Sequence, residues 1–252
     1  MLKTQRYISS ELTHFVGAGL ADHESQYALL LKILRTGILL TPGKSGVVIQ
    51  HGDKGPVRTI QTTHTTNYLE YLSSNRKYQA SIVCFADIPL DDLHLHIKKY
   101  SGFGLSFLRP FLLLQGANPV FYIARQAIVN LPKKDSLEVS RVTLADHYDA
   151  AEELLSRLVI RPPVDPSAKP LGPLDPAAAE FLTNHLFPLM KFFDAELADE
   201  HPENYYMERE WRVVGPVRFR VQDIERLLLP RAFSTRLRTD VPSFSGQLSL
   251  TD

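Results

Sequence analysis

The spacing of apolar residues along the chain predicts helices and strands in mixed order. Between Glu24 and Arg35, four large apolar residues recur at helical spacing, and Gly37 follows as a stop signal. The same periodicity predicts further helices over Leu90–Tyr100, Leu144–Ile160, Ala177–Glu200 and Gln222–Leu229.

Short runs of branched and aromatic residues predict strands between these helices. They lie at Tyr7–Val16, Thr59–Gln61, Ser81–Phe85, Phe103–Phe107, Val120–Ala124, Tyr206–Val214 and Val217–Val221. Because most of these strands fall in the outer thirds of the chain, the pattern favours an α+β fold.

A proline-rich segment interrupts the pattern. The range Arg161–Pro176 contains six prolines, each of which fixes φ and lacks a backbone donor. It is either a linker between domains or a long loop within one domain. We favour a single domain over residues 1–252, because the apolar segments on either side are too short for a separate second core. Asp175 and Pro176 form a good start for the helix that follows.

Composition narrows the class of protein. The chain has 252 residues, of which 44% are hydrophobic and 22% charged, as in ordinary globular proteins. Its net charge is zero, which argues against a generally basic nucleic-acid binder. Charge is unevenly spread, with 14 acids and five bases from Asp135 to Glu203 and eight arginines against four acids from Arg209 to Asp240. These regions either attract one another or leave a basic groove for an anionic ligand.

Several chemistries are disfavoured. Cys84 is the single cysteine, so an intramolecular disulfide is excluded and a thiolate zinc site is not expected. Its apolar neighbours predict a buried, structural thiol. His94 and His96 are two residues apart, which places them on different faces of a helix, so we expect no metal site.

The first residues lack the apolar core of a signal peptide, and no run of about 18 apolar residues suggests a membrane span. We therefore expect a cytoplasmic protein.

The most informative segment is Tyr205–Val214. In a strand, alternation would place Glu208, Glu210 and Arg212 on one face. Such a charged row is either the solvated face of an edge strand or a pair of carboxylates aimed at a ligand, with the arginine holding one of them. Sequence alone leaves these two interpretations open.

Two other segments carry candidate side chains. His14 lies beside Thr13 in an apolar strand, either as a hydrogen-bonded core residue or as a contact for a sugar hydroxyl. Further on, Gly102 and Gly104 flank Phe103, which would allow a ligand to approach the backbone closely.

These segments together resemble the AbiGi-type abortive phage infection family, whose members are usually labelled antitoxins. The resemblance rests on Tyr7-Ile-Ser-Ser-Glu-Leu-Thr-His-Phe, Thr36-Gly-Ile-Leu, Cys84-Phe-Ala-Asp-Ile-Pro-Leu, Lys99-Tyr-Ser-Gly-Phe-Gly-Leu-Ser-Phe and Glu208-x-Glu-Trp-Arg. The layout resembles, more distantly, the ADP-ribosyltransferase superfamily. That resemblance implies a split β-sheet core with flanking helices and NAD as substrate.

The more distant resemblance implies roles for individual residues. Glu210 would be the catalytic carboxylate, stabilising positive charge on the ribose as nicotinamide leaves, with Glu208 preceding it and acting on the incoming nucleophile. The residues that would bind NAD are His14, Thr13, Gly37, Tyr100, Phe103 and Arg212. The chain lacks the Ser-Thr-Ser signature of that superfamily. Its absence weakens the assignment of Tyr100 and Phe103 as NAD-binding residues more than the assignment of Glu210 as the catalytic residue.

Two functions follow as hypotheses. The first is an anti-phage toxin that transfers ADP-ribose from NAD to a macromolecule such as RNA, held by a cognate antitoxin. The second is a non-catalytic antitoxin that binds a partner toxin, in which case Glu208 and Glu210 serve structure or an interface. Simple NAD hydrolysis is a variant of the first.

Overall fold

The computed structural model describes residues 9–40, 51–52, 55–56, 71–75, 77–78, 82–89, 92–132, 139–160, 175–198, 201 and 203–252. The predicted strand Thr59–Gln61 and most of the proline-rich segment lie outside these residues. Within them, helices and strands mix along the chain, which confirms the α+β class.

A seven-stranded sheet forms the centre of the molecule, in the order β15-β14-β6-β1-β5-β12-β7. The strands are β1 (Glu11–Phe15), β5 (Ile82–Ala86), β6 (Gly104–Leu108), β7 (Asn118–Pro119), β12 (Glu210–Val214), β14 (Ile224–Leu229) and β15 (Gln247–Leu250). Only β14 and β15 pair in parallel; the other neighbours are antiparallel.

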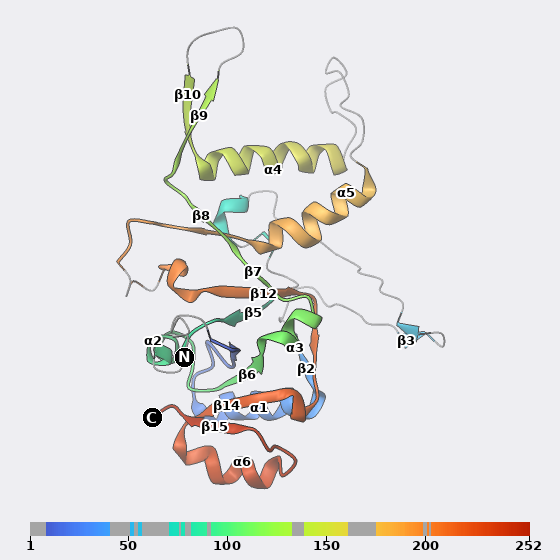
Figure 1. Cartoon of the computed structure of the whole chain (residues 1–252), viewed down its shortest axis with the longest axis vertical. Coiled ribbons are helices and arrows are strands. Elements are labelled where there is room, and N and C mark those ends of the chain that lie inside the picture. The colour runs from blue at the N-terminus through green and yellow to red at the C-terminus, as the bar shows by residue number, and fades with distance from the viewer. Residues whose placement is uncertain are drawn as a thin grey trace, which may run out of the picture.

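One face of this sheet carries the main hydrophobic core. Alternation turns Leu12, Phe85, Val213 and Leu227 to this face, where α1 (His23–Thr36) covers them. The N-cap Asp22 accepts a hydrogen bond from the Ser25 amide, and the helix ends at Gly37, as predicted. The helix α6 (Ser234–Asp240) adds Leu237 to the same core (Figure 1).

The opposite face of the sheet is partly covered by α2 (Leu93–Lys99). Leu93 and Ile97 pack there against Ala86, Ile88 and Leu228. The short helix α3 (Arg109–Leu114) follows β6 directly. Two separate two-stranded ladders lie outside the central sheet: β2 (Ile38–Leu39) pairs with β13 (Val217–Arg218), and β3 (His51–Gly52) pairs with β4 (Gly55–Pro56).

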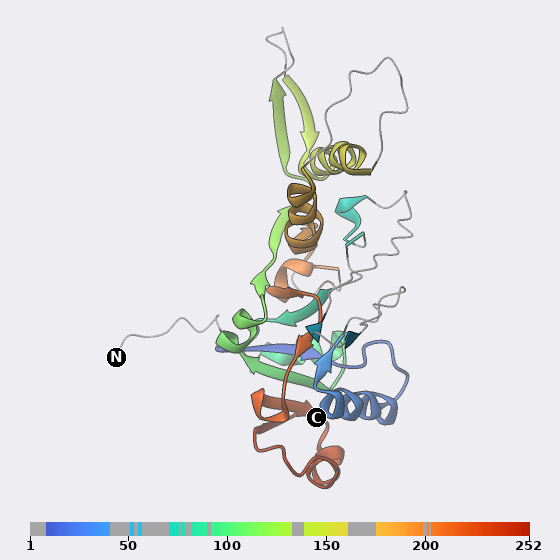
Figure 2. The same ribbon diagram turned by 90° about the vertical axis from the view of Figure 1, so that its right-hand side faces the viewer.

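A second, smaller core extends the molecule away from the sheet, giving the elongated outline of Figures 1 and 2. The strand β8 (Phe121–Ala124) pairs in parallel with β11 (Met190–Phe193). Ile123 and Phe192 from this pair pack with Leu72 and Phe187. The hairpin β9 (Ile128–Pro132) and β10 (Val139–Thr143), with the helices α4 (Leu144–Ile160) and α5 (Pro176–Phe181), forms this end of the molecule.

Two predicted helices are corrected by the structure. The range Ala177–Glu200 contains a helix only to Phe181, then a π turn, a 3-10 turn and β11, because Pro188 removes a backbone donor where the helix would continue. The predicted helix Gln222–Leu229 is mainly β14. Its residues are good helix formers, but burial between β6 and β15 outweighs that weak preference.

Candidate functional site

The charged row predicted on Tyr206–Val214 is formed partly by a strand and partly by a turn. Glu208 ends a 3-10 helix at Tyr205–Glu208, and Arg209 adopts a left-handed conformation with φ 45° before β12 begins at Glu210. The strand prediction was therefore wrong at its start. Glu210 and Arg212 do share one face of β12, opposite Ala86 and Cys84 of β5.

Two buried carboxylates and three cations form one network at this position, which we call the charge cluster: Lys99, Lys191, Glu208, Glu210 and Arg212. Lys191 Nζ lies 2.9 Å from Glu210 Oε2 and 3.6 Å from Glu208 Oε2, so it bridges the carboxylates. Lys99 Nζ lies 2.6 Å from Glu208 Oε1. Both carboxylates are about 95% buried, with exposed fractions of 6% for Glu208 and 5% for Glu210.

Arg212 connects the charge cluster to the second core. Its Nε donates to Glu210 Oε1 at 2.7 Å, and one terminal nitrogen donates to Glu210 Oε2 at 3.4 Å. The other terminal nitrogen donates to the carbonyls of Pro188 and Met190, just before and at the start of β11. A guanidinium offers five donors. Four of the five are therefore engaged within the protein.

Aromatic side chains surround the charge cluster. The Tyr100 hydroxyl donates to Glu208, and the Tyr100 ring stacks on Phe15 with centroids 5.6 Å apart. Lys191 Nζ lies 4.3 Å from the ring centroid of Tyr205, within cation–π range. The amide of Glu210 donates to the Tyr122 hydroxyl at 2.6 Å. Tyr100 thus binds a carboxylate directly, while Tyr205 contacts Lys191 and Tyr122 holds the backbone of Glu210.

The surroundings fix the protonation of the charge cluster. Burial opposes ionisation of Glu210, but Arg212 and Lys191 together outweigh it and lower its pKa to about 2. Burial also opposes the charged form of Lys191 and lowers its pKa. Glu210 and Glu208 outweigh this effect, so the pKa of Lys191 is higher than that of an ordinary lysine. Burial, followed by Glu208, raises the pKa of Tyr100. Near neutral pH Glu210 is thus an ion, which is a poor general acid or base at that pH.

Cys84 lies beside Glu210 on the same face. Solvent reaches its side chain, so the expectation of a fully buried thiol was wrong. Closely packed protein atoms, followed by the charge of Glu210, nevertheless raise the pKa of the thiol. The raised pKa keeps Cys84 a neutral thiol near neutral pH.

The two candidates on β1 point to opposite faces. Thr13 shares the face of Glu210, and its hydroxyl lies 2.8 Å from that of Ser106. His14 faces the main core, with its ring 5.8 Å from Phe85 and its Nδ1 2.8 Å from the Cys84 carbonyl. A carbonyl only accepts, so Nδ1 carries the proton. Burial lowers the pKa of His14 more than this hydrogen bond raises it.

The remaining candidates have structural contacts. Phe103 is fully buried in the main core, edge-on to Phe233. Gly37 has φ +62° at the end of α1, and a Cβ there would lie 2.4 Å from the Phe219 carbonyl oxygen. The structure therefore brings Glu208, Glu210, Arg212 and Tyr100 together, but not His14, Gly37 or Phe103.

Sequence reasoning missed both lysines of the charge cluster. Lys191 lies on β11, a strand hidden inside a predicted helix, and Lys99 ends α2. The Pro188-Leu-Met-Lys-Phe-Phe run inside the predicted helix Ala177–Glu200 was the available signal, since a proline followed by a short aromatic run indicates a strand start. Among the residues that the structure describes, no group of three or more His, Cys, Asp or Glu side chains is placed to hold a metal ion.

Fold and site together define an α+β protein whose paired carboxylates are held in an ionic network between a sheet and a second core. A family profile described as "Putative abortive phage resistance protein AbiGi, antitoxin" matches residues 61–240, and the chain belongs to this family. No curated protein and no solved structure matches the chain. The ADP-ribosyltransferase-like core consequently remains a prediction.

Proposed function

We propose that this protein is the antitoxin of an abortive infection system, a non-catalytic protein that binds and restrains a partner toxin. The observation that carries the proposal is the saturation of the charge cluster. The Arg212 side chain is engaged by Glu210 and two main-chain carbonyls, and each carboxylate is paired with at least one cation. A network satisfied from within is suited to holding two parts of a fold together.

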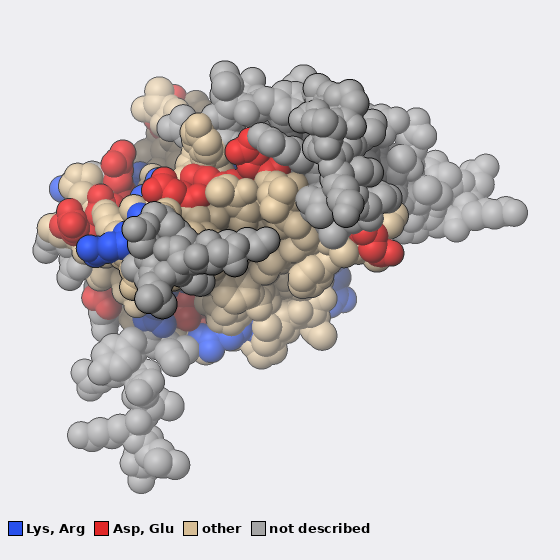
Figure 3. Space-filling view, turned by 90° about the horizontal axis from the view of Figure 1, so that it is seen from above, with Lys and Arg blue, Asp and Glu red and all other residues tan. Residues whose placement is uncertain are grey.

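The surface at the second core supports a binding role. Leu154 on α4 is 51% exposed and Phe181 at the end of α5 is 55% exposed. These helices are neighbours in Figures 1 and 2, and Figure 3 shows acidic side chains beside a broad uncharged area at this end. Exposed apolar side chains rimmed by charge are typical of protein contact surfaces.

ADP-ribosyl transfer from NAD to a macromolecule such as RNA is the second candidate. It is favoured by the meeting of Glu208, Glu210 and Tyr100 in one place. Against it, the residues assigned to NAD do not form one site: His14 lies on the other face of the sheet, Phe103 is in the core, and the Arg212 guanidinium is occupied. We therefore derive no catalytic step through NAD.

Expression and NAD turnover together test the proposal. We expect bacteria to grow normally when the intact chain is strongly induced, and to survive induction of the toxin of the same system only when the chain is co-expressed. Purified protein should leave labelled NAD intact in the presence of RNA, DNA or cell lysate. Label on an acceptor, lost in Glu210→Gln, would reject the antitoxin and establish the transferase.

Among the described residues, no helix is both long enough and apolar enough to cross a bilayer.

A further inference from the structure

The helix α4 has one side packed in the second core and one side exposed to solvent. Helical spacing turns Ala145, Tyr148 and Leu155 toward the second core, where they pack against its buried residues. Four of the exposed residues on the other side, which we call the α4 outer face, are Asp146, Ala150, Glu153 and Leu154. The fold leaves these side chains accessible to another molecule.

The acidic side chains on the two sides of α4 have different contacts. On the packed side, Glu152 forms an ion pair of 2.5 Å with Lys77 and accepts a hydrogen bond of 2.7 Å from the Tyr78 hydroxyl. On the outer face, Asp146 accepts from the uncharged Thr143 hydroxyl at 2.7 Å, and it takes part in none of the ion pairs within the described part of the chain. The inner carboxylate therefore serves the fold, whereas Asp146 presents its charge to solvent.

The surface around the α4 outer face is acidic. Among the side chains that the structure describes in residues 121–131, 140–155 and 175–198, five acidic residues are exposed, and Arg141 is the one exposed base. The five are Asp146, Glu153, Asp175, Glu180 and Glu196. Figure 3 views the molecule from this end. Such a surface repels the phosphates of a nucleic acid and attracts a positively charged protein surface.

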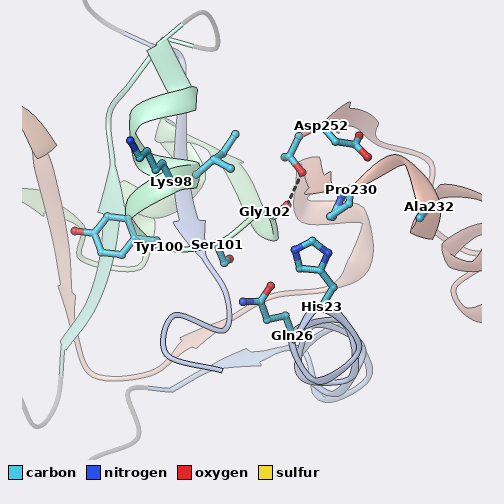
Figure 4. Close-up of a pocket in the computed structure, with 11 residues that line it drawn as sticks. His23, Gln26, Lys98, Tyr100, Ser101, Gly102, Pro230, Ala232 and Asp252 are labelled. Atoms are coloured by element: carbon cyan, nitrogen blue, oxygen red, sulfur yellow. Dashed lines mark hydrogen bonds between the residues drawn. The ribbon is translucent and has the colours of Figure 1, made fainter. Parts of the chain in front are cut away.

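The shape and apolar content of the α4 outer face are suited to a protein partner. Leu154 is 51% exposed and lies one turn from Ala150, whose small side chain allows close approach. The cavity of about 400 Å³ in Figure 4 lies elsewhere, between the start of α1 and the residues after β14 and β15, and α4 contributes nothing to its lining. An apolar centre with a charged margin is the usual arrangement of a protein interface.

We propose that the α4 outer face docks a basic surface of the partner toxin, with an apolar toxin side chain against Leu154 and Lys or Arg side chains around Asp146 and Glu153. The inference rests on the proposed function, because it names the part of the surface that holds the toxin. Charge selects this occupant. A two-fold contact between copies of this chain would bring the same acidic face against itself, which is repulsive.

Two variants and two matched controls test the surface. Glu153→Lys reverses a charge of the α4 outer face, and Leu154→Ser removes its apolar side chain. Asp92→Lys reverses an exposed charge at the start of α2, where the carboxylate makes no capping hydrogen bond. Leu114→Ser removes an apolar side chain that is 87% exposed on α3. Because all four positions are exposed, each variant should keep the circular dichroism spectrum of the original protein.

Binding of the full chain to the purified toxin of the same system is measured by surface plasmon resonance at low and high NaCl concentration. We expect Glu153→Lys to slow association at least about fivefold at low salt and much less at high salt, because ions screen the attraction. Leu154→Ser should speed dissociation at least about tenfold, because most interface changes act on that rate. Both controls should match the original protein.

The outcomes separate this inference from the proposed function. Toxin binding that neither Glu153→Lys nor Leu154→Ser weakens would overturn the docking surface and leave the antitoxin role intact. Failure of the original chain to bind the toxin would reject both. Binding of labelled RNA, or self-association in ultracentrifugation without toxin, that these variants abolish would assign the face to another occupant and overturn the proposal.

Discussion

Glu210 separates two buried cations, Lys191 and Arg212, and its removal should cost much more than a surface ion pair. We expect Glu210→Gln to lower the free energy of unfolding by about 3–5 kcal/mol, because Arg212 would remain buried without a counterion and Lys191 would keep only its 3.6 Å contact with Glu208. The matched control is Glu24→Gln. Glu24 and Arg236 are 66% and 50% exposed, so their pair should contribute less than about 1 kcal/mol. If urea denaturation showed that both variants lose the same free energy of unfolding, the buried network would be contradicted.

The lowered pKa of Glu210 also has a consequence in acid. Its folded-state pKa of about 2 lies below the ordinary value of 4.5, so its contribution to stability is present above pH 4.5. That contribution is lost as the pH falls from 4.5 toward 2. Urea midpoints measured at pH 6, 4 and 3 should fall steeply in the original protein and less steeply in Glu210→Gln.

His96 should make stability depend on pH in a higher range than Glu210 does. Both of its ring nitrogens lack partners, and its ring stacks on Phe15. Burial lowers its pKa to about 4, below the ordinary 6.5, so the unfolded chain binds more protons and stability falls as the pH drops from 6.5 to 4. His96→Phe keeps the stacked ring and removes the titration. We expect it to be more stable than the original by about 1–3 kcal/mol at pH 4.5. An unchanged pH profile between pH 7 and 4.5 would show that His96 does not titrate there.

At the scale of elements, the end of α1 depends on one glycine. Gly37 has a left-handed φ, and the Cβ that Gly37→Ala adds would lie 2.4 Å from the Phe219 carbonyl oxygen. Gly19→Ala is the matched control, because Gly19 also has positive φ but nothing lies within 4 Å of its would-be Cβ. We expect about 1 kcal/mol lost in the control from the backbone alone, and at least about 2 kcal/mol lost in Gly37→Ala. Thermal unfolding of both variants measures the difference.

How far sequence predicts these elements depends on how much each relies on local signals. The helix α1 carries its own start and stop, Asp22 and Gly37, and α4 occupies the predicted range. By contrast, β14 is a strand because of its neighbours, and its residues alone favour a helix. The charge cluster was half predictable: Glu210 and Arg212 share a face through strand alternation, whereas Lys191 arrives from a strand that sequence did not reveal.

At the scale of the whole molecule, Arg212 couples the sheet to the second core. We expect Arg212→Lys to keep a charge near Glu210 but to lose the hydrogen bonds to Pro188 and Met190, since an ammonium cannot reproduce the planar fork. Amide hydrogen exchange should then become faster in β8 and β11, while β6 and α1 stay protected. Uniformly faster exchange across both cores would indicate a single cooperative unit instead.

The last strand of the sheet, β7, has only two residues, Asn118 and Pro119, and pairs with β12. Another chain could form few backbone hydrogen bonds with β7, because the strand is short and its proline has no amide hydrogen to donate. We therefore expect that a strand from another molecule does not add to the sheet at β7. Under the proposed function, we expect a partner toxin to contact a part of the surface other than β7, and we expect copies of the protein not to associate through this strand.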